Sequence, residues 1–278
     1  MKPPFAYYGG KTTIAQQIAG LFPRHDHYVE PFAGSLAVLL AKRPSRMETV
    51  NDLDGHVMTF WRVLRDRPLD LERVCSFTPH SRAEYEACQN IDEVDDELEV
   101  ARRVWVRLTQ GRGAQLRRPT GWRHFKDPNG ASFGMPGYIE AYRNRFAPAA
   151  ARLIGVSLEA RPALEVIETY GGYERTLLYV DPPYLGSTRN WGNQYRHELR
   201  TDDEHRELAE VLRSVKASVV LSGYPSDLYD VELYADWHRM EIATQNMQGG
   251  ARSPRTEVLW SNRPFPAAHD ALFEDVIA

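Results

Sequence analysis

Asp181-Pro182-Pro183-Tyr184 is the stretch of this sequence whose residue types could do chemistry, and it directly follows the apolar run Leu177 to Val180. A short apolar run that stops at two prolines predicts a buried strand, because proline cannot donate a hydrogen bond to a neighbouring strand. The carboxylate, the proline carbonyls and the aromatic ring would then emerge at the carboxyl end of a strand, where open α/β sheets bind ligands. Such groups can hold a planar base and accept hydrogens from its amino group. The alternative is that the prolines only end the strand and Tyr184 only packs.

Two segments near the N-terminus contain glycines and precede predicted helices. Tyr7-Tyr8-Gly9-Gly10-Lys11 precedes an apolar pattern of helical spacing, and Glu30-Pro31-Phe32-Ala33-Gly34-Ser35 follows the strand-like run His27 to Val29. Small residues between a strand and a helix let a ligand reach backbone amides at the helix N-terminus, although an ordinary turn has the same composition. A phosphate-binding loop would need glycine five positions before Gly10, where Phe5 stands. The sequence therefore argues against a nucleotide triphosphatase.

Asp52 follows the next strand-like run, Met47 to Val50. An acid at this position binds ribose hydroxyls in nucleotide-binding α/β folds. The alternative is that Asp52 caps the helix that follows, a role that Asp54 fills at least as well.

The elements that must position these residues alternate between strand and helix. Residues 1–66 and 151–278 predict α/β units and a parallel sheet, with Thr201 and Glu204 forming a capping box before a helix. Val219 to Leu221 and Glu257 to Trp260 are later strand candidates. The pattern changes at residues 67–150, which we interpret as a mainly helical insertion into one α/β domain.

A basic window lies within this insertion. Residues 101–145 hold ten Lys and Arg against two acids, about +8 in a chain of net charge −4, with glycines and aromatic residues interleaved. This composition is typical of loops or a hairpin that present cations and rings to nucleic acid. A solvated charged face is the alternative.

The overall composition places limits on the class of protein. A chain of 278 residues that is 42% hydrophobic can bury a large core. No apolar run approaches 18 residues, and the N-terminus lacks an apolar signal core, so neither membrane spanning nor export is expected. The two cysteines fit neither a disulfide framework nor a zinc site, which favours a reducing, cytosolic setting.

Together and in this order, the three segments at residues 7–11, 30–35 and 181–184 resemble the Dam-type DNA adenine methyltransferases. These are group α amino-methyltransferases that use S-adenosylmethionine. Leu185 to Arg189 and Arg255 to Asn262 look like the bacteriophage branch. The resemblance implies a Rossmann-like methyltransferase sheet with an inserted, mainly helical target-recognition domain. It also implies double-stranded DNA as partner, no metal, a monomer, a cytoplasmic location in a bacterium or phage-infected host, and a role in restriction–modification or regulation.

The resemblance also assigns roles to residues of this chain. The catalytic set is Asp181, Pro182, Pro183 and Tyr184. The cofactor set is Tyr7, Gly9, Gly10, Lys11, Glu30, Pro31, Phe32, Ala33, Gly34, Ser35, Asp52 and Asp181. The DNA set is Arg112, Arg117, Arg118, Arg123 and Lys126 in the insertion and Arg189, Trp191, Tyr195 and Arg196 after the catalytic motif, where an ordinary surface loop is the alternative.

The implied reaction is methyl transfer to the exocyclic amino nitrogen of adenine. The Asp181 carboxylate and the Pro182 carbonyl would accept the amino hydrogens, which directs the nitrogen lone pair at the methyl group. Tyr184 would stack on a base flipped out of the duplex. Two alternatives stay open: amino-methylation of cytosine or RNA, and a DNA-binding protein that has lost activity. Arg161-Pro162 departs from the acid or amide that the family places near the cofactor adenine.

Overall fold

The computed structural model describes residues 1–124, 134–183, 199, 201–248 and 251–266, and within 245–255 only the backbone is considered. Its centre is a sheet of order β3-β2-β1-β4-β5-β7-β6. The first five strands pair in parallel, and β7 is antiparallel to both β5 and β6. The strands are β1 His27–Glu30, β2 Met47–Asn51, β3 Val156–Glu159, β4 Thr176–Val180, β5 Ser218–Gly223, β6 His238–Gln248 and β7 Ala251–Ser261.

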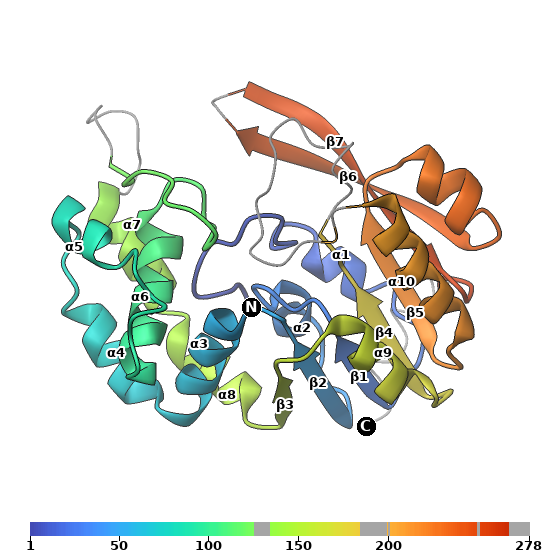
Figure 1. Ribbon diagram of the computed structural model, residues 1–278, viewed down its shortest axis with the longest axis horizontal. Coiled ribbons are helices and arrows are strands. Elements are labelled where there is room, and N and C mark those ends of the chain that lie inside the picture. Colours follow the sequence, from blue (N-terminus) through green and yellow to red (C-terminus); the bar gives the residue numbers. More distant parts are fainter. Residues whose placement is uncertain (125–133, 184–198, 200, 249–250, 267–278) are drawn as a thin grey trace, which may run out of the picture.

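Helices cover both faces of this sheet (Figure 1). Every residue of β1, β4 and β5 is buried, as a parallel sheet between two helical layers requires. Alternate residues point to opposite faces, so Tyr28 and Tyr179 join one apolar cluster and Val29 and Leu178 the other. The helices of the first layer include α1 Ala15–Ala19, α2 Ala37–Ala41 and α3 Gly55–Asp66, and those of the second are α9 Ala163–Gly171, α10 Asp202–Ser214 and the π-helical turn η2 Leu228–Leu233.

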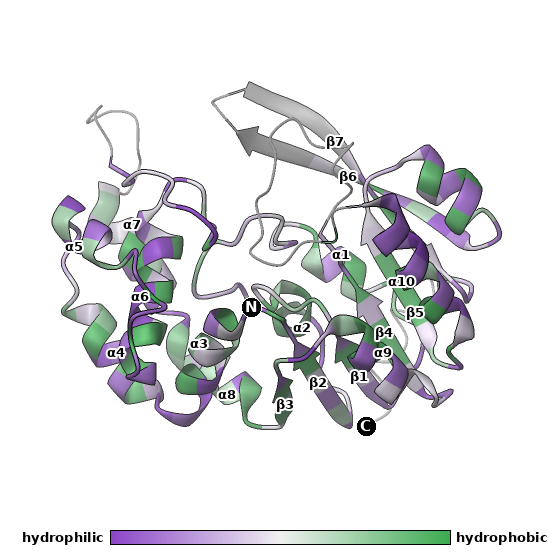
Figure 2. Ribbon diagram, viewed as in Figure 1, coloured by the Kyte–Doolittle hydropathy of each residue, from purple (hydrophilic) through white to green (hydrophobic). Residues whose placement is uncertain are grey.

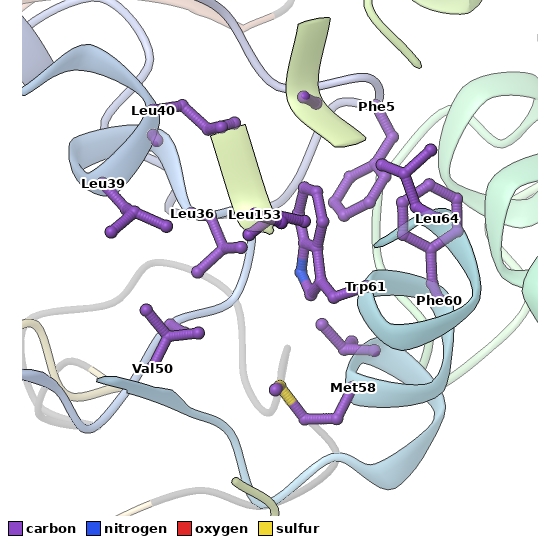
Figure 3. Packing of buried hydrophobic residues seen from close by; sticks show 14 of the residues in the cluster. Phe5, Leu36, Leu39, Leu40, Val50, Met58, Phe60, Trp61, Leu64 and Leu153 are labelled. Atoms are coloured by element: carbon purple, nitrogen blue, oxygen red, sulfur yellow. The ribbon is translucent and has the colours of Figure 1, made fainter. Parts of the chain in front are cut away.

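The predicted insertion corresponds to a group of helices beside the sheet, which we call the helical lobe (Figure 1). The lobe packs on α3 through a core that continues to α2 and β2, where Phe5, Phe60, Trp61 and Leu153 meet (Figure 3). The boundaries at residues 66 and 150 stay a prediction, because this core is shared. The lobe comprises α4 Pro68–Ser76, α5 Arg82–Ala87, α6 Glu97–Gln110, α7 Gly134–Arg143 and α8 Phe146–Leu153.

Hydropathy explains how these elements face each other. Figure 2 shows that β4 and β5 are largely apolar, and that helices such as α10 and α4 carry hydrophilic residues on their outer faces. The predicted capping box is confirmed, since Thr201 accepts from the Glu204 amide and Glu204 accepts from the Thr201 amide. The helix after the loop at residues 30–35 begins at Ala37, because Leu36 takes a left-handed conformation with φ of 53°.

Candidate active site

A cavity of about 550 Å³ lies where the carboxyl ends of β1, β2 and β4 meet. Parallel strands bring their ends to one edge, so segments from distant parts of the chain converge there. The lining includes every residue predicted for the cofactor: residues 7 and 9–11, residues 30–35, Asp52 and Asp181. The structure thus brings these residues together, and their role in binding stays a prediction.

The predicted catalytic motif begins where β4 ends, as expected from its prolines. Asp181 and Pro183 line the cavity, and Pro182 is buried between them. Tyr184 lies outside the described residues. The motif therefore presents a carboxylate to the cavity directly after a rigid, fully buried strand.

Lys11 is bound to Asp181. Its ammonium is 2.6 Å from both carboxylate oxygens of Asp181 and 3.5 Å from Oε1 of Glu257. Burial lowers the pKa of Lys11, but the two carboxylates outweigh burial, and the pKa lies well above its ordinary value. Burial raises the pKa of Asp181 to about 6 even though Lys11 opposes this shift. The sequence predicted Lys11 beside a cofactor but not beside the catalytic acid.

Glu30 places a second acid in the cavity. The side chain is buried and accepts a hydrogen bond of 2.9 Å from the Tyr28 hydroxyl. Burial raises the pKa of Glu30 to about 8, and the nearby charge of Asp181 adds to this shift. Near neutral pH the protonated form of this carboxyl is therefore favoured in the ligand-free protein.

The two glycine-containing loops touch each other at Gly34. This residue has φ of 45°, and a Cβ atom placed on it would lie 2.9 Å from Cε1 of Tyr7. A Cβ on Gly10 would lie 3.0 Å from Oγ of Ser35. The Gly34 carbonyl also accepts a bond from Nε1 of Trp61. Gly34 is thus required by its positive φ and by the Tyr7 ring, and Gly10 allows the Ser35 hydroxyl to approach closely.

The structure separates the roles proposed for Asp52 and Asp54. Asp54 is the N-cap of α3 and accepts from the His56 amide at 3.0 Å. Asp52 lines the cavity, and its carboxylate accepts from the amides of Gly34 and Asp54. Burial raises the pKa of Asp52 to about 6. Asp52 therefore joins the ends of β1 and β2 and leaves helix capping to Asp54.

Asn51 holds three strand ends together, a role that no sequence motif indicated. Its amide nitrogen donates to the carbonyls of Pro31 and Arg161, and its oxygen accepts from the Arg161 amide. The Arg161 guanidinium pairs with Glu159 and Glu165. Pro162 therefore lines the cavity, whereas the guanidinium of the neighbouring Arg161 pairs with acids that are not among the lining residues.

Several further lining residues lie outside the predicted cofactor and catalytic sets. Tyr179 points to the same sheet face as Asp181, two residues later, so strand periodicity could have found it. Its hydroxyl is buried and has no hydrogen-bond partner within the described part of the chain. The others are Tyr8, Ala37, Val38, Leu53, Asp54, Pro162, Ala163, Leu164, Leu199 and Glu204.

Part of the predicted DNA set lies on the loop between α6 and α7. Arg112 and Arg118 are exposed, and Arg117 is half-buried. Arg123 donates to the carbonyls of Gly111 and Arg112, so its guanidinium also holds the loop. Lys126, Arg189, Trp191, Tyr195 and Arg196 lie outside the described residues. The loop reaches the cavity, because the Ala114 carbonyl accepts from the amide of Tyr8, a lining residue.

The number of Lys and Arg counted over residues 101–145 is larger than the number available to nucleic acid. Arg102 and Arg103 pair with Glu99, and Arg102 also pairs with Glu84. Arg107 is buried and donates to the carbonyls of Leu116 and Gln89. These three cations stabilise the helical lobe, so a count over sequence could not identify the arginines that face solvent.

Within the described ranges, no helix is both long and apolar enough to cross a membrane. The same residues contain no cluster of three or more His, Cys, Asp or Glu side chains arranged to hold a metal ion.

Comparisons with known proteins were made for the whole chain. A family model described as D12 class N6 adenine-specific DNA methyltransferase matches residues 7–247. No curated protein matches the sequence. Among solved structures, precorrin 8w decarboxylase of Methanobacterium thermoautotrophicum is similar at 9% identity and a TM-score of 0.40, over 95% of this chain and 100% of that one. A similarity this low supports no conclusion about fold or function.

Proposed function

Because the chain belongs to the D12 class N6 adenine-specific DNA methyltransferases, we propose that the cavity at the carboxyl edge of its sheet binds both the methyl donor and the target adenine. Members of this family are enzymes that methylate adenine in DNA with S-adenosylmethionine. The proposal rests on the position of Asp181. This residue directly follows the buried strand β4, and it lines a cavity to which both glycine-containing loops contribute.

The residues present fit S-adenosylmethionine. This cofactor carries a positive sulfonium and a positive ammonium, and the cavity offers the carboxyl groups of Glu30, Asp52 and Asp181. We assign the methionine part to the loops at residues 9–11 and 32–34, and the ribose hydroxyls to Asp52. Leu53 and Leu164 give the cofactor adenine an apolar surface, which replaces the polar contact missing at Pro162. The bound cofactor supplies the methyl group.

The chain itself activates the adenine amino group. We infer that the Asp181 carboxylate and the Pro182 carbonyl accept the two amino hydrogens, because both belong to the segment that ends β4. These bonds favour a tetrahedral nitrogen with its lone pair directed at the methyl group. Stacking on Tyr184 and flipping of the base complete the proposal, because the amino group is inaccessible to this chemistry inside the duplex.

DNA would lie across the loop at residues 111–124. Exposed arginines on this loop can contact phosphates or guanine edges, and the bond between Tyr8 and Ala114 joins the loop to the cavity. We further infer the Dam-type subgroup and its bacteriophage-like branch, a monomeric enzyme, and action in the cytoplasm of a bacterium or infected host. The three segments at residues 7–11, 30–35 and 181–184 support the subgroup, and residues 185–189 and 255–262 support the branch.

Transfer of labelled methyl from S-adenosylmethionine to unmethylated duplex DNA tests the proposal, followed by nucleoside analysis and sequencing of the modified positions. We expect methyladenine in one sequence context. Asp181→Ala should lower the rate at least about 100-fold and leave cofactor affinity within a modest factor. Asp95→Ala, which removes an exposed acid remote from the cavity, is the control. Near-normal turnover of Asp181→Ala would refute the assigned role.

A further inference from the structure

Lys11 is held between two buried carboxylates, and only one of them faces the cavity. Asp181 lines the cavity and has both oxygens at 2.6 Å from the Lys11 ammonium. Glu257 is not among the lining residues, its side chain is 4% exposed, and its Oε1 is 3.5 Å from the same ammonium. Glu257 therefore contacts Lys11 from outside the cavity, and its charge also acts on Asp181.

The position of Glu257 is set by two strands. Oε1 of Glu257 accepts a hydrogen bond of 2.5 Å from the Ser222 hydroxyl. Ser222 is in β5 and Glu257 in β7, and these strands pair directly at Ser222 and Leu259. The carboxylate is consequently anchored by the sheet, whereas Lys11 lies at the end of a four-carbon side chain in a loop.

The resting contact of Lys11 conflicts with the role of Asp181. Lys11 binds both oxygens of Asp181, and the target amino group needs one of them. Lys11 must then move away, but a buried cation without a partner is strongly unfavourable. Glu257 is the second carboxylate already in contact, so a small shift of the ammonium would keep it paired.

We propose that Glu257 is a positioning residue for methyl transfer: it takes over the Lys11 ammonium when the target amino group binds Asp181. This inference rests on the proposed role of Asp181. It assigns a function in the reaction to a residue on the antiparallel strand β7, outside the cavity.

Removing the charge of Glu257 tests the inference. Glu257→Gln keeps the size of the side chain and can still accept from Ser222, but it cannot pair with a cation. In single-turnover experiments at pH 7.5 we expect the methyl-transfer rate to fall roughly tenfold or more, with the dissociation constant of S-adenosylmethionine within about twofold of wild type. An unchanged rate would overturn the inference.

The pH profile distinguishes this role from a merely structural one. Among the described residues, Lys11 and Glu257 act on the pKa of Asp181, and the charge of Asp181 in turn raises the pKa values of Glu30, Tyr179 and Tyr229. The negative charge of Glu257 raises the pKa of Asp181, so its loss lowers that pKa. Asp181 must be ionised to accept a hydrogen, and the rate falls as pH drops through its pKa. In Glu257→Gln this fall should therefore occur at lower pH than in wild type.

Glu257→Asp is the matched variant, because it keeps the charge and shortens the reach to Lys11 by one methylene. We expect slower methyl transfer, with the fall in rate at low pH occurring at the same pH as in wild type. If both variants lose rate and cofactor affinity together and neither profile moves, Glu257 only supports packing and the inference is wrong. Wild type and Asp181→Ala are assayed in parallel. If these two behave as proposed while Glu257→Gln matches wild type, only the inference about Glu257 fails.

Discussion

Single residues determine the charge of the cavity. Lys11 neutralises one carboxylate, and the remaining acids respond to burial by binding protons more tightly. Glu30 shows this effect most strongly, with a pKa of about 8 against an ordinary value of 4.5. A raised acid pKa favours the protonated form in the folded protein, so the contribution of Glu30 to the stability of the ligand-free protein falls as pH rises from 4.5 towards 8.

A cation bound in the cavity stabilises the ionised form of Glu30 and therefore lowers its pKa, which opposes the effect of burial. The gain in melting temperature on adding saturating S-adenosylmethionine should therefore increase between about pH 6 and pH 8. Glu30→Gln should flatten this dependence. S-adenosylhomocysteine, which lacks the sulfonium charge, should show a smaller increase with wild-type protein. An equal gain at every pH for wild type and Glu30→Gln would contradict the assignment of Glu30 to the cofactor. Thermal unfolding across this pH range is the measurement.

At the scale of elements, the cavity depends on contact between the loop after β1 and the N-terminal loop. Gly34 carries a positive φ and lies against the Tyr7 ring, and the Trp61 indole of α3 bonds to its carbonyl. The loop after β1 is thus fixed from two sides before any ligand binds. Asp52 adds a third contact through the Gly34 amide.

Gly34→Ala should disturb this contact. A left-handed alanine costs about 1–2 kcal/mol, and the added Cβ, 2.9 Å from Tyr7, forces the ring to move. We expect lower thermal stability and a cofactor affinity reduced roughly tenfold, measured by calorimetry. Gly172→Ala is the control, since Gly172 has φ of −70° and no atom lies within 4 Å of the added Cβ. Unchanged cofactor affinity in Gly34→Ala would show that the loop contact is not needed.

The whole molecule places a basic loop beside a cavity lined with acids. The chain carries a net charge of −4, so attraction to DNA must come from local surface rather than from overall charge. Arg102, Arg103 and Arg107 are used inside the helical lobe. The loop at residues 111–124 therefore carries the exposed cations of the lobe that lie close to the cavity.

Replacing Arg117 and Arg118 by alanine should weaken DNA binding and reduce its dependence on salt. Each lost phosphate contact lowers the slope of log K against log salt by about 0.9, so a loss approaching about 2 is expected. The matched control is Arg24→Ala with Arg46→Ala, because these exposed arginines lie on the loops that enter β1 and β2, at the opposite edge of the sheet. Fluorescence anisotropy over a salt series measures both slopes. Equal slopes for the two double variants would exclude the loop from the DNA surface.

The sequence by itself determined those features that depend on residues close together in the chain. Prolines end β4 at the catalytic motif, Thr201 and Glu204 cap α10, and the alternation of strands and helices indicated a parallel sheet. The order of three short motifs was sufficient to indicate the family, because each motif is contiguous. The sequence also placed residues 30–35, Asp52 and Asp181 each directly after a predicted strand, and the carboxyl ends of parallel strands lie at one edge of a sheet.

Only the tertiary structure decided which of these residues pair. Lys11 and Asp181 are 170 positions apart, and Glu257 reaches Lys11 from an antiparallel strand. The contact of Gly34 with Tyr7 and the internal pairing of Arg102 likewise join separate segments. Such contacts depend on how helices and strands pack in three dimensions, and side-chain periodicity carries no information about partners so distant in the chain.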